Sequence, residues 1–319
     1  MASKRRIIAI EEHYLDPEVT RHFGDAEAAR QPAIVERLEN LSNLRLKEMD
    51  EAGIDLQVLS HAGPSMQRFD PETAVRLARL ANDRLHQAVE RHPTRLAGFA
   101  ALPTPDPKAA ADELERTVTK YGFKGAMVFG LTNGLFLDDK RFWPIFERAQ
   151  ALDVPIYLHP ANPSPAVVEA YYKDYAKEFP QLLRAGWGFT VETATQGIRM
   201  VLSGVFEAYP RLKIVLGHLG EGLPFLLWRI DSALSREGNR PLRFRELFCK
   251  HFWITTSGFF SNPALLCCVQ EMGVDRIIFS IDYPFVANQP GVDWIDTIPL
   301  CEEDKAKILH GNVERLLKL

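Results

Sequence analysis

The sequence contains only four cysteines among 319 residues, and no two of them have the CxxC spacing of a zinc finger or a redox pair. Neither a disulfide framework nor a cysteine-based zinc site is therefore expected to hold the fold together. A few buried thiols are typical of a protein in a reducing cytoplasm, which is the location that we expect. The cysteines are Cys249, Cys267, Cys268 and Cys301.

The sequence also lacks an excess of either charge. Lys and Arg number 38 against 42 Asp and Glu, which gives a formal net charge of −4. Because this composition provides no basic surface, nucleic acid is not an expected partner. No apolar run approaches the roughly 18 residues of a membrane span, so no membrane segment is expected. The basic residues 1–6 are followed by only four apolar residues, which is too short for a signal-peptide core.

What the sequence does contain is a series of eight short, almost continuously apolar runs, which are typical of strands covered on both faces. Stretches with helical periodicity, such as 74–88 and 143–152, lie between most of them. This alternation predicts an α/β protein with a (β/α)8 TIM barrel, and a doubly wound sheet is the alternative. The runs are 6–10, 56–60, 96–102, 125–130, 155–159, 213–218, 253–257 and 277–282.

Two connections between the runs are unusually long and predict insertions after strands 1 and 5. Residues 15–46 include the start of a predicted helix over Val35 to Glu51, and residues 161–187 are rich in aromatic side chains. Insertions at the carboxyl ends of barrel strands commonly build lids and contacts between subunits. No repeat or linker interrupts the chain, so residues 1–319 are predicted to form one domain.

Side chains that can bind a metal ion stand where several of the apolar runs end. In a barrel of parallel strands, functional side chains gather at these carboxyl ends. Residues that follow strands 1, 5, 6 and 8 are therefore expected to meet in space, where carboxylates and imidazoles together suit one metal ion. The side chains concerned are Glu11, His13, His159, His218 and Asp282.

Each of these residues also has a less specific interpretation. The segment 11–13 would fit a surface loop, because charged residues are mostly exposed. A single histidine such as His159 is more often a hydrogen-bonded structural residue than a ligand. Glu221 follows His218 by three residues and could orient its ring. Arg229, about two helical turns further on, is either a substrate contact or half of an ordinary salt bridge.

Seven motifs lie along nearly the whole chain: EEH (11–13), FAALP (99–103), GFKGA (122–126), LDVPIYLHP (152–160), GHLGEGLP (217–224), TTSG (255–258) and FSIDYPF (279–285). Together they resemble the amidohydrolase superfamily. The resemblance is to its branch of metal-dependent, non-oxidative aromatic acid decarboxylases, which includes the γ-resorcylate, 2,3-dihydroxybenzoate and salicylate decarboxylases. It implies a (β/α)8 barrel that binds one divalent metal ion.

The resemblance also implies roles for individual residues. His218 would stand beside the metal with support from Glu221, and Arg229 would bind the substrate. Many superfamily hydrolases carry His-x-His on the first strand and a carboxylated Lys on the fourth. Here the first position is Glu, and the run 125–130 contains no Lys, so a mononuclear site is implied. Its ligands would be Glu11, His13, His159 and Asp282.

Two positions depart from the pattern of this branch. Phe129 stands where the decarboxylases commonly carry an Asn near the end of the fourth strand. Ala161 stands where an Arg usually follows the His-Pro pair of the fifth strand. Both changes predict a less polar substrate pocket with Phe129 as a contact.

The expected reaction is the non-oxidative decarboxylation of an ortho-hydroxylated benzoate to a phenol and CO2. The metal would be Zn²⁺, Mn²⁺ or Mg²⁺ and would act as Lewis acid and template, and no organic cofactor is expected. Asp282 would protonate the ring carbon that bears the carboxylate, while His218 and Glu221 adjust the protons of the site. Arg229 would anchor an anionic substituent through a bidentate contact.

Two other interpretations remain open from the sequence. A metal-dependent hydrolase of an ester, lactone or amide would use the same ligands, with Asp282 as the base. A purely structural metal is less favoured, because closed structural sites prefer four tight ligands that include Cys. The expected partner is a small aromatic carboxylic acid, and the chain is expected to form a homo-oligomer, a dimer or a tetramer.

Overall fold

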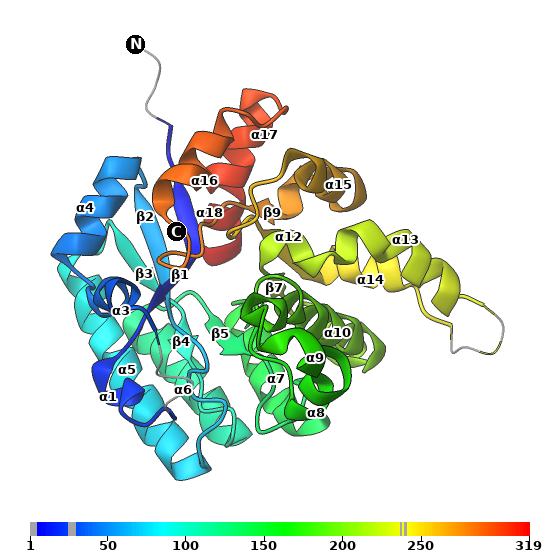
Figure 1. The fold of residues 1–319 in the computed structure, drawn as a ribbon, viewed down its shortest axis with the longest axis horizontal. Coiled ribbons are helices and arrows are strands. Elements are labelled where there is room, and N and C mark those ends of the chain that lie inside the picture. The colour runs from blue at the N-terminus through cyan, green and yellow to red at the C-terminus, as the bar shows by residue number, and fades with distance from the viewer. Residues whose placement is uncertain (1–4, 25–29, 237, 239–240) are drawn as a thin grey trace.

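A computed structural model describes residues 5–24, 30–236, 238 and 241–319. Parallel strands form the centre of the molecule and helices surround them (Figure 1). The strands are β1 (Ile8–Tyr14), β2 (Leu56–His61), β3 (Leu96–Gly98), β4 (Ala100–Ala101), β5 (Ala126–Phe129), β6 (Ile156–His159), β7 (Ile214–Leu216), β8 (Phe252–Thr255) and β9 (Ile277–Ile278).

The strand order follows the chain without reversal, in two parallel sheets of order β1-β2-β3 and β4-β5-β6-β7-β8-β9. The sheets meet at Phe99, whose amide donates to Leu59 O, while the Ala100 amide donates to Gly125 O. β3 and β4 are therefore the two halves of the predicted third strand. A doubly wound sheet reverses its strand order at a switch point. The continuous order confirms the barrel over that alternative.

The helices that surround the strands also follow the chain in sequence. Several begin with Pro in the first turn, and α5 and α6 also have an Asp at the N-cap, as helix starts prefer. The α-helices are α1 (Pro17–Thr20), α3 (Pro32–Glu39), α4 (Asn43–Ala52), α5 (Pro71–Arg91), α6 (Pro107–Tyr121), α7 (Trp143–Leu152), α8 (Pro165–Val167), α9 (Lys173–Ala176), α10 (Gly188–Leu202), α11 (Val205–Ala208), α12 (His218–Glu221), α13 (Leu223–Leu234), α14 (Phe244–His251), α15 (Asn262–Met272), α16 (Asn288–Ile295), α17 (Glu302–Ala306) and α18 (Asn312–Leu317).

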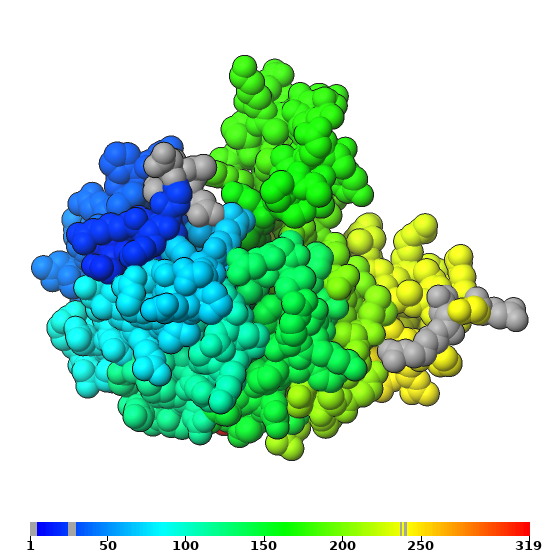
Figure 2. Space-filling view, turned by 90° about the horizontal axis from the view of Figure 1, so that it is seen from below, coloured from blue at the N-terminus to red at the C-terminus, as the bar shows by residue number. Residues whose placement is uncertain are grey.

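Short 3-10 and π segments complete the chain: η1 (Lys140–Phe142), η2 (Val168–Tyr172), η3 (Pro180–Leu183), η4 (Val274–Arg276) and η5 (Lys307–Gly311). The second long connection contains α8, η2, α9 and η3 and forms the green lobe that stands out from the body of the molecule (Figure 2). No helix in the described ranges is both long and apolar enough to cross a membrane.

The prediction of one helix over Val35 to Glu51 was wrong. The structure has two helices there, α3 and α4, separated by Asn40 and the two residues that follow it. The Asn40 side-chain oxygen accepts hydrogen bonds from the amides of Ser42 and Leu44, at 3.1 and 3.2 Å. This turn ends one helix and starts the next, because Asn side chains compete with the helical backbone for its hydrogen bonds.

Apolar side chains fill the barrel on both sides of the strands, as the continuous apolar runs predict. Alternate residues such as Ile8 and Ile10 point inward, and α18 closes the amino-terminal end of the barrel with Val313, Leu316 and Leu317. The outward-facing residues, such as Ala9 and Leu59, pack against the helices. The carboxyl ends of the strands are left for polar side chains.

Candidate metal centre and active site

The four predicted ligands lie together at the carboxyl end of the barrel. Glu11 and His13 come from β1, His159 ends β6, and Asp282 follows β9. One ligand atom of each lies within 4.8 Å of all the others. Glu11, His13 and His159 are buried, whereas 17% of the Asp282 side chain is exposed. The cluster therefore has one side through which a small molecule can approach.

The two carboxylate oxygens of Glu11 have different surroundings. Oε1 accepts no hydrogen bond from a described residue, and it lies 3.1 Å from Nε2 of His159 and 3.5 Å from Nε2 of His218. This oxygen is thus buried, fixed in place and without a hydrogen-bond donor. Oε2 is held by three hydroxyl donors, those of Tyr157, Thr255 and Ser257.

Hydrogen bonds also orient the two histidine rings. Nδ1 of His159 lies 2.8 Å from the carbonyl oxygen of Pro160. Because a carbonyl can only accept, Nδ1 carries the proton, and the lone pair of Nε2 is directed into the cluster. Nδ1 of His13 lies 3.1 Å from the hydroxyl of Ser60, which directs its Nε2 toward Oδ1 of Asp282 at 3.1 Å. Nε2 of His159 has no hydrogen-bond partner among the described residues.

The charges of the cluster suit a metal ion. Burial opposes ionisation of Glu11, but His218 and His159 outweigh it and hold the pKa of Glu11 below its ordinary value. Burial lowers the pKa of His13, although Asp282 opposes this shift. A carboxylate and a neutral imidazole are the forms that bind metal ions. Two buried ligand atoms without hydrogen-bond partners point into the same space, so the residues present fit one divalent cation.

His218 and Glu221, the first and last residues of α12, lie next to this cluster. Nδ1 of His218 lies 2.7 Å from Oε1 of Glu221, whose other oxygen accepts from the hydroxyl of Thr190 at 2.9 Å. Burial disfavours a charged His218, but Glu221 and Glu11 outweigh it and raise the pKa of His218 to about 10. A divalent cation in the cluster would oppose that charge. The predicted orientation of His218 by Glu221 is present in the geometry.

Apolar rings border the predicted ligands. The centroid of Phe129 lies 4.5 Å from that of His159 and 5.9 Å from that of His13, and Phe129 is buried. The Phe285 ring lies 5.6 Å from His13 and is 46% exposed. A Cβ on Gly130 would lie 2.5 Å from Cβ of Ala161. The Phe129 ring thus packs against the two histidine ligands from the buried side, while Phe285 lies at the exposed side of the cluster.

Arg229 lies away from this cluster. It is exposed on α13, near Phe225 and directly after Trp228, whose exposed fractions are 80% and 73%. Among the described residues, no hydrogen bond or ion pair joins Arg229 to Asp231 or to the ligands; Asp231 instead accepts from the Arg245 amide. Among the described residues of one chain, the alternative salt bridge with Asp231 is thus not formed, and the contact of Arg229 with substrate stays a prediction.

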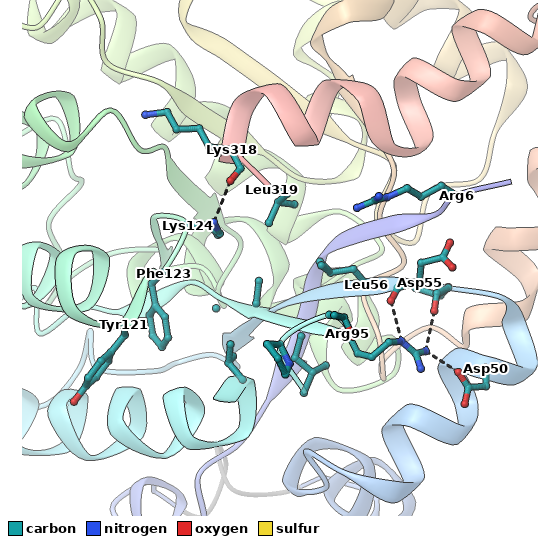
Figure 3. Close-up of a pocket in the computed structure, with 18 of the residues that line it drawn as sticks. Arg6, Asp50, Asp55, Leu56, Arg95, Tyr121, Phe123, Lys124, Lys318 and Leu319 are labelled. Atoms are coloured by element: carbon teal, nitrogen blue, oxygen red, sulfur yellow. Dashed lines mark hydrogen bonds and ion pairs between the residues drawn. The ribbon is translucent and has the colours of Figure 1, made fainter. Parts of the chain in front are cut away.

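A hollow of about 870 Å³ lies at the opposite end of the barrel (Figure 3). Its lining includes Leu56 and Leu96, which begin β2 and β3. Arg95 pairs with Asp50 at 2.7 Å, and Lys124 donates to the carbonyl oxygen of Lys318 at 3.2 Å. Because function in such barrels lies at the carboxyl ends of the strands, this hollow is not the active site.

The sequence reasoning missed the hydroxyl groups that hold the ligands. Tyr157 precedes His159 by two residues, so strand alternation places both side chains on one face. The same spacing joins Thr255 and Ser257 at the end of β8. The sequence therefore shows that these hydroxyl groups share a face with the end of their strand. It does not show that they meet at Glu11, because that depends on how the strands are aligned.

The site geometry agrees with the family of the chain. The sequence profile of the amidohydrolase family matches residues 13–319, and the chain belongs to this family. It is similar to the γ-resorcylate decarboxylase of Polaromonas sp. (strain JS666), with 40% identity over 325 residues and 98% coverage of both chains.

Solved structures extend this similarity. A 2,6-dihydroxybenzoate decarboxylase in complex with 2,6-dihydroxybenzoate matches with a TM-score of 0.91 and 38% identity, covering 99% of this chain and 100% of the other. A dihydroxybenzoic acid decarboxylase from Polaromonas sp. JS666, with bound manganese and the inhibitor 2-nitroresorcinol, matches with a TM-score of 0.89 and 40% identity. The coverage is 99% of this chain and 97% of that one. These matches confirm the resemblance that the sequence motifs carry.

Proposed function

We propose that the protein is a metal-dependent carboxy-lyase that converts an ortho-hydroxylated benzoate to the corresponding phenol and CO2. The observation that carries this proposal is the pair of buried ligand atoms, Glu11 Oε1 and His159 Nε2, which lie 3.1 Å apart and have no hydrogen-bond partner among the described residues. Relatives of the same length decarboxylate dihydroxybenzoates, and one binds manganese with an aromatic inhibitor. Glu11, His13, His159 and Asp282 would hold the metal ion.

When bound, the cation supplies Lewis acidity and a template for the carboxylate and the adjacent phenolate oxygen of the substrate. Asp282 is the ligand with the most exposed side chain, so it is placed to exchange a proton with a substrate in the opening. Its proton adds to the ring carbon that bears the carboxylate. The bond from that carbon to the carboxylate then breaks, its electrons restore the aromatic ring, and CO2 leaves.

His218 and Glu221 would maintain the proton supply of the site. Glu221 is fixed by the hydroxyl of Thr190 and by Nδ1 of His218, so the imidazole presents Nε2 toward Glu11. Such paired groups, whose environments shift their pKa values, are common where protons are transferred.

The apolar surroundings bear on the choice of substrate. The family resemblance implies that Phe129 and Ala161 stand where related decarboxylases carry polar side chains, so fewer hydrogen bonds would be offered to a second ring substituent. The substrate panel should therefore contain 2,6-dihydroxybenzoate, salicylate and alkyl-substituted salicylates. A site that lacks donors for a hydroxyl group loses its preference for the hydroxylated substrate.

The decisive experiment loads the purified protein with Mn²⁺ or Zn²⁺ and measures CO2 release and phenol formation over this panel. Metal-dependent CO2 release in equal amount to the phenol supports the carboxy-lyase. If no benzoate is decarboxylated but esters, lactones or amides are cleaved, the hydrolase is the correct function. Activity that persists after complete removal of the metal would contradict both.

We further propose that the chain forms a homo-oligomer of two or four copies. Large exposed aromatic side chains gather on α13 and on the lobe between β6 and α10, and a stable interface would bury them. Since Arg229 lies on α13 beside Phe225 and Trp228, its predicted contact with substrate requires a second copy. The exposed aromatic residues of the lobe are Tyr171, Tyr175, Phe179 and Trp187.

A mixing experiment tests this arrangement. Arg229→Ala and Asp282→Asn should each be inactive alone and regain part of the activity when mixed, because one mixed site has both residues intact. If a mixed oligomer recovers no activity, Arg229 either acts within its own chain or has no catalytic role. The cytoplasmic location and the single domain over residues 1–319 stay predictions; the free cysteines fit the former.

A further inference from the structure

The junction between the last and the first strand of the barrel differs from the other junctions. β1 and β9 stand at the ends of the two sheets, and no ladder joins them among the described residues. The hydroxyl of Ser280 instead accepts from the amides of Ile10 and Glu11, at 3.3 and 2.6 Å. The His13 amide donates to the carbonyl oxygen of Tyr283 at 2.7 Å. The two metal-ligand segments are therefore joined by irregular hydrogen bonds.

Glu12 contributes most of the remaining contacts across this junction. Its Oε1 accepts from the Ser280 hydroxyl and from the Ile281 amide, both at 2.9 Å. Its Oε2 accepts from the Tyr283 amide at 3.1 Å. Glu12 is completely buried, and strand alternation turns it away from its neighbours Glu11 and His13. The Glu12 side chain thus contacts neither solvent nor the ligand cluster directly.

The two amides that Glu12 binds are those on either side of Asp282. β9 ends at Ile278, so Asp282 lies four residues beyond the strand. The prediction that Asp282 closes the last strand was therefore wrong. Its φ of 75° is unusual for any residue with a side chain. Such a conformation persists only where the surroundings determine it. Carboxyl groups in catalytic sites must be held within about 0.5 Å of their working position.

We propose that Glu12 is a positioning residue for Asp282: by binding the amides of Ile281 and Tyr283 from β1, it fixes the Asp282 carboxyl against the ligands that β1 carries. β1 and the segment that follows β9 then supply three of the four predicted metal ligands as one unit. Only the part of this role that concerns proton delivery depends on the proposed decarboxylation.

Glu12→Gln tests the proposal with little change in volume. The amide retains one acceptor oxygen, but its NH2 group faces the Tyr283 amide, which also donates. Hydrogen-bonding partners of metal ligands typically contribute about 10–100-fold to metal affinity or activity. We therefore expect the Mn²⁺ dissociation constant to rise by about tenfold or more. At saturating Mn²⁺, kcat should fall while KM changes little, because the loss affects the transition state more than binding.

Glu113→Gln is the matched control. Glu113 is also a buried carboxylate, on α6, and it accepts from Asn82 at 2.8 Å and from Arg116 at 2.6 Å. The control should lower thermal stability without changing Mn²⁺ affinity or kcat. Thermal unfolding of both variants shows whether a comparable loss of stability alone explains the effect.

Parental Mn²⁺ affinity together with parental kcat in Glu12→Gln, or losses equal to those of Glu113→Gln, would overturn the proposal. A larger change in either quantity supports it. The affinity measurement needs no substrate, so it decides the role of Glu12 even if the parent releases no CO2 and the proposed function fails. If Glu12→Gln does not fold, Glu12→Asp, which keeps the charge but shortens the reach, is judged by the same criteria.

Discussion

Gly217→Ala should damage the metal centre although no ligand is changed. A Cβ built on Gly217 would lie 2.7 Å from Oε2 and 3.1 Å from Oε1 of Glu11. Because real contacts of a Cβ essentially never fall below 3.0 Å, one group must move by at least 0.3 Å, which is 3.0 minus 2.7. Glu11 is buried, and its Oε2 is held by three hydroxyl groups, so it cannot move without losing hydrogen bonds.

The size of the effect follows from this displacement. Overpacking of a buried site typically costs about 1–3 kcal/mol of stability. Movement of Glu11 would also displace Oε1, so we expect metal affinity to fall by about 10–100-fold, as when a supporting contact of a ligand is lost. Gly217 has a φ of −73°, which other residues adopt freely, so backbone strain does not contribute.

The assay is a titration of the metal-free protein with Mn²⁺, combined with thermal unfolding in the absence of metal. Gly311→Ala is the control, because its new Cβ would meet no atom closer than 3.7 Å. That variant should bind Mn²⁺ as the parent does. If Gly217→Ala also has the parental affinity and stability, Oε1 of Glu11 is not a ligand held in this position.

Three further predictions concern single residues. His159→Ala should remove the metal and the activity together, and full occupancy by elemental analysis would rule out His159 as a ligand. Asp282→Asn at saturating metal should stop deuterium exchange at the ring carbon ortho to the product hydroxyl, a loss of about 10²–10⁴-fold for a general acid; exchange at the parental rate would leave Asp282 a ligand only. Burial lowers the pKa of His61 to about 4, so the unfolded chain takes up a proton first as the pH falls. Stability should therefore decline between about pH 6.5 and 4 by up to about 3 kcal/mol, and urea unfolding of His61→Gln should show a flatter decline.

Three of the four predicted metal ligands could be placed from the sequence because one rule applies to them. The apolar runs of strands 1, 5, 6 and 8 end at or next to a residue with a metal-binding side chain, and parallel strands bring their carboxyl ends together. Glu11, His13 and His159 needed no knowledge of register to be assigned. Asp282 was assigned for the wrong local reason, since β9 is short and a loop carries the residue to the cluster.

Contacts that depend on alignment between distant segments could not be predicted in the same way. The hydroxyl groups around Glu11 come from β6, from β8 and from Ser257, which follows β8. Only the register of those strands brings the three groups to one oxygen. The exposure of Arg229 depends on which side of α13 faces the barrel. The break at Asn40 depends on a side-chain hydrogen bond that competes with an otherwise regular helical pattern.

The separation of the two metal-ligand segments along the chain has a consequence for biosynthesis. His13 and Asp282 are 269 residues apart, yet their side chains lie 3.1 Å from one another. At the usual rate of roughly 5–20 residues per second, a ribosome needs about 13 to 54 s to make the chain between them. During that time Glu11 and His13 have left or are leaving the exit tunnel without Asp282, which follows β9. The complete set of four predicted ligands therefore exists only after most of the polypeptide has been made.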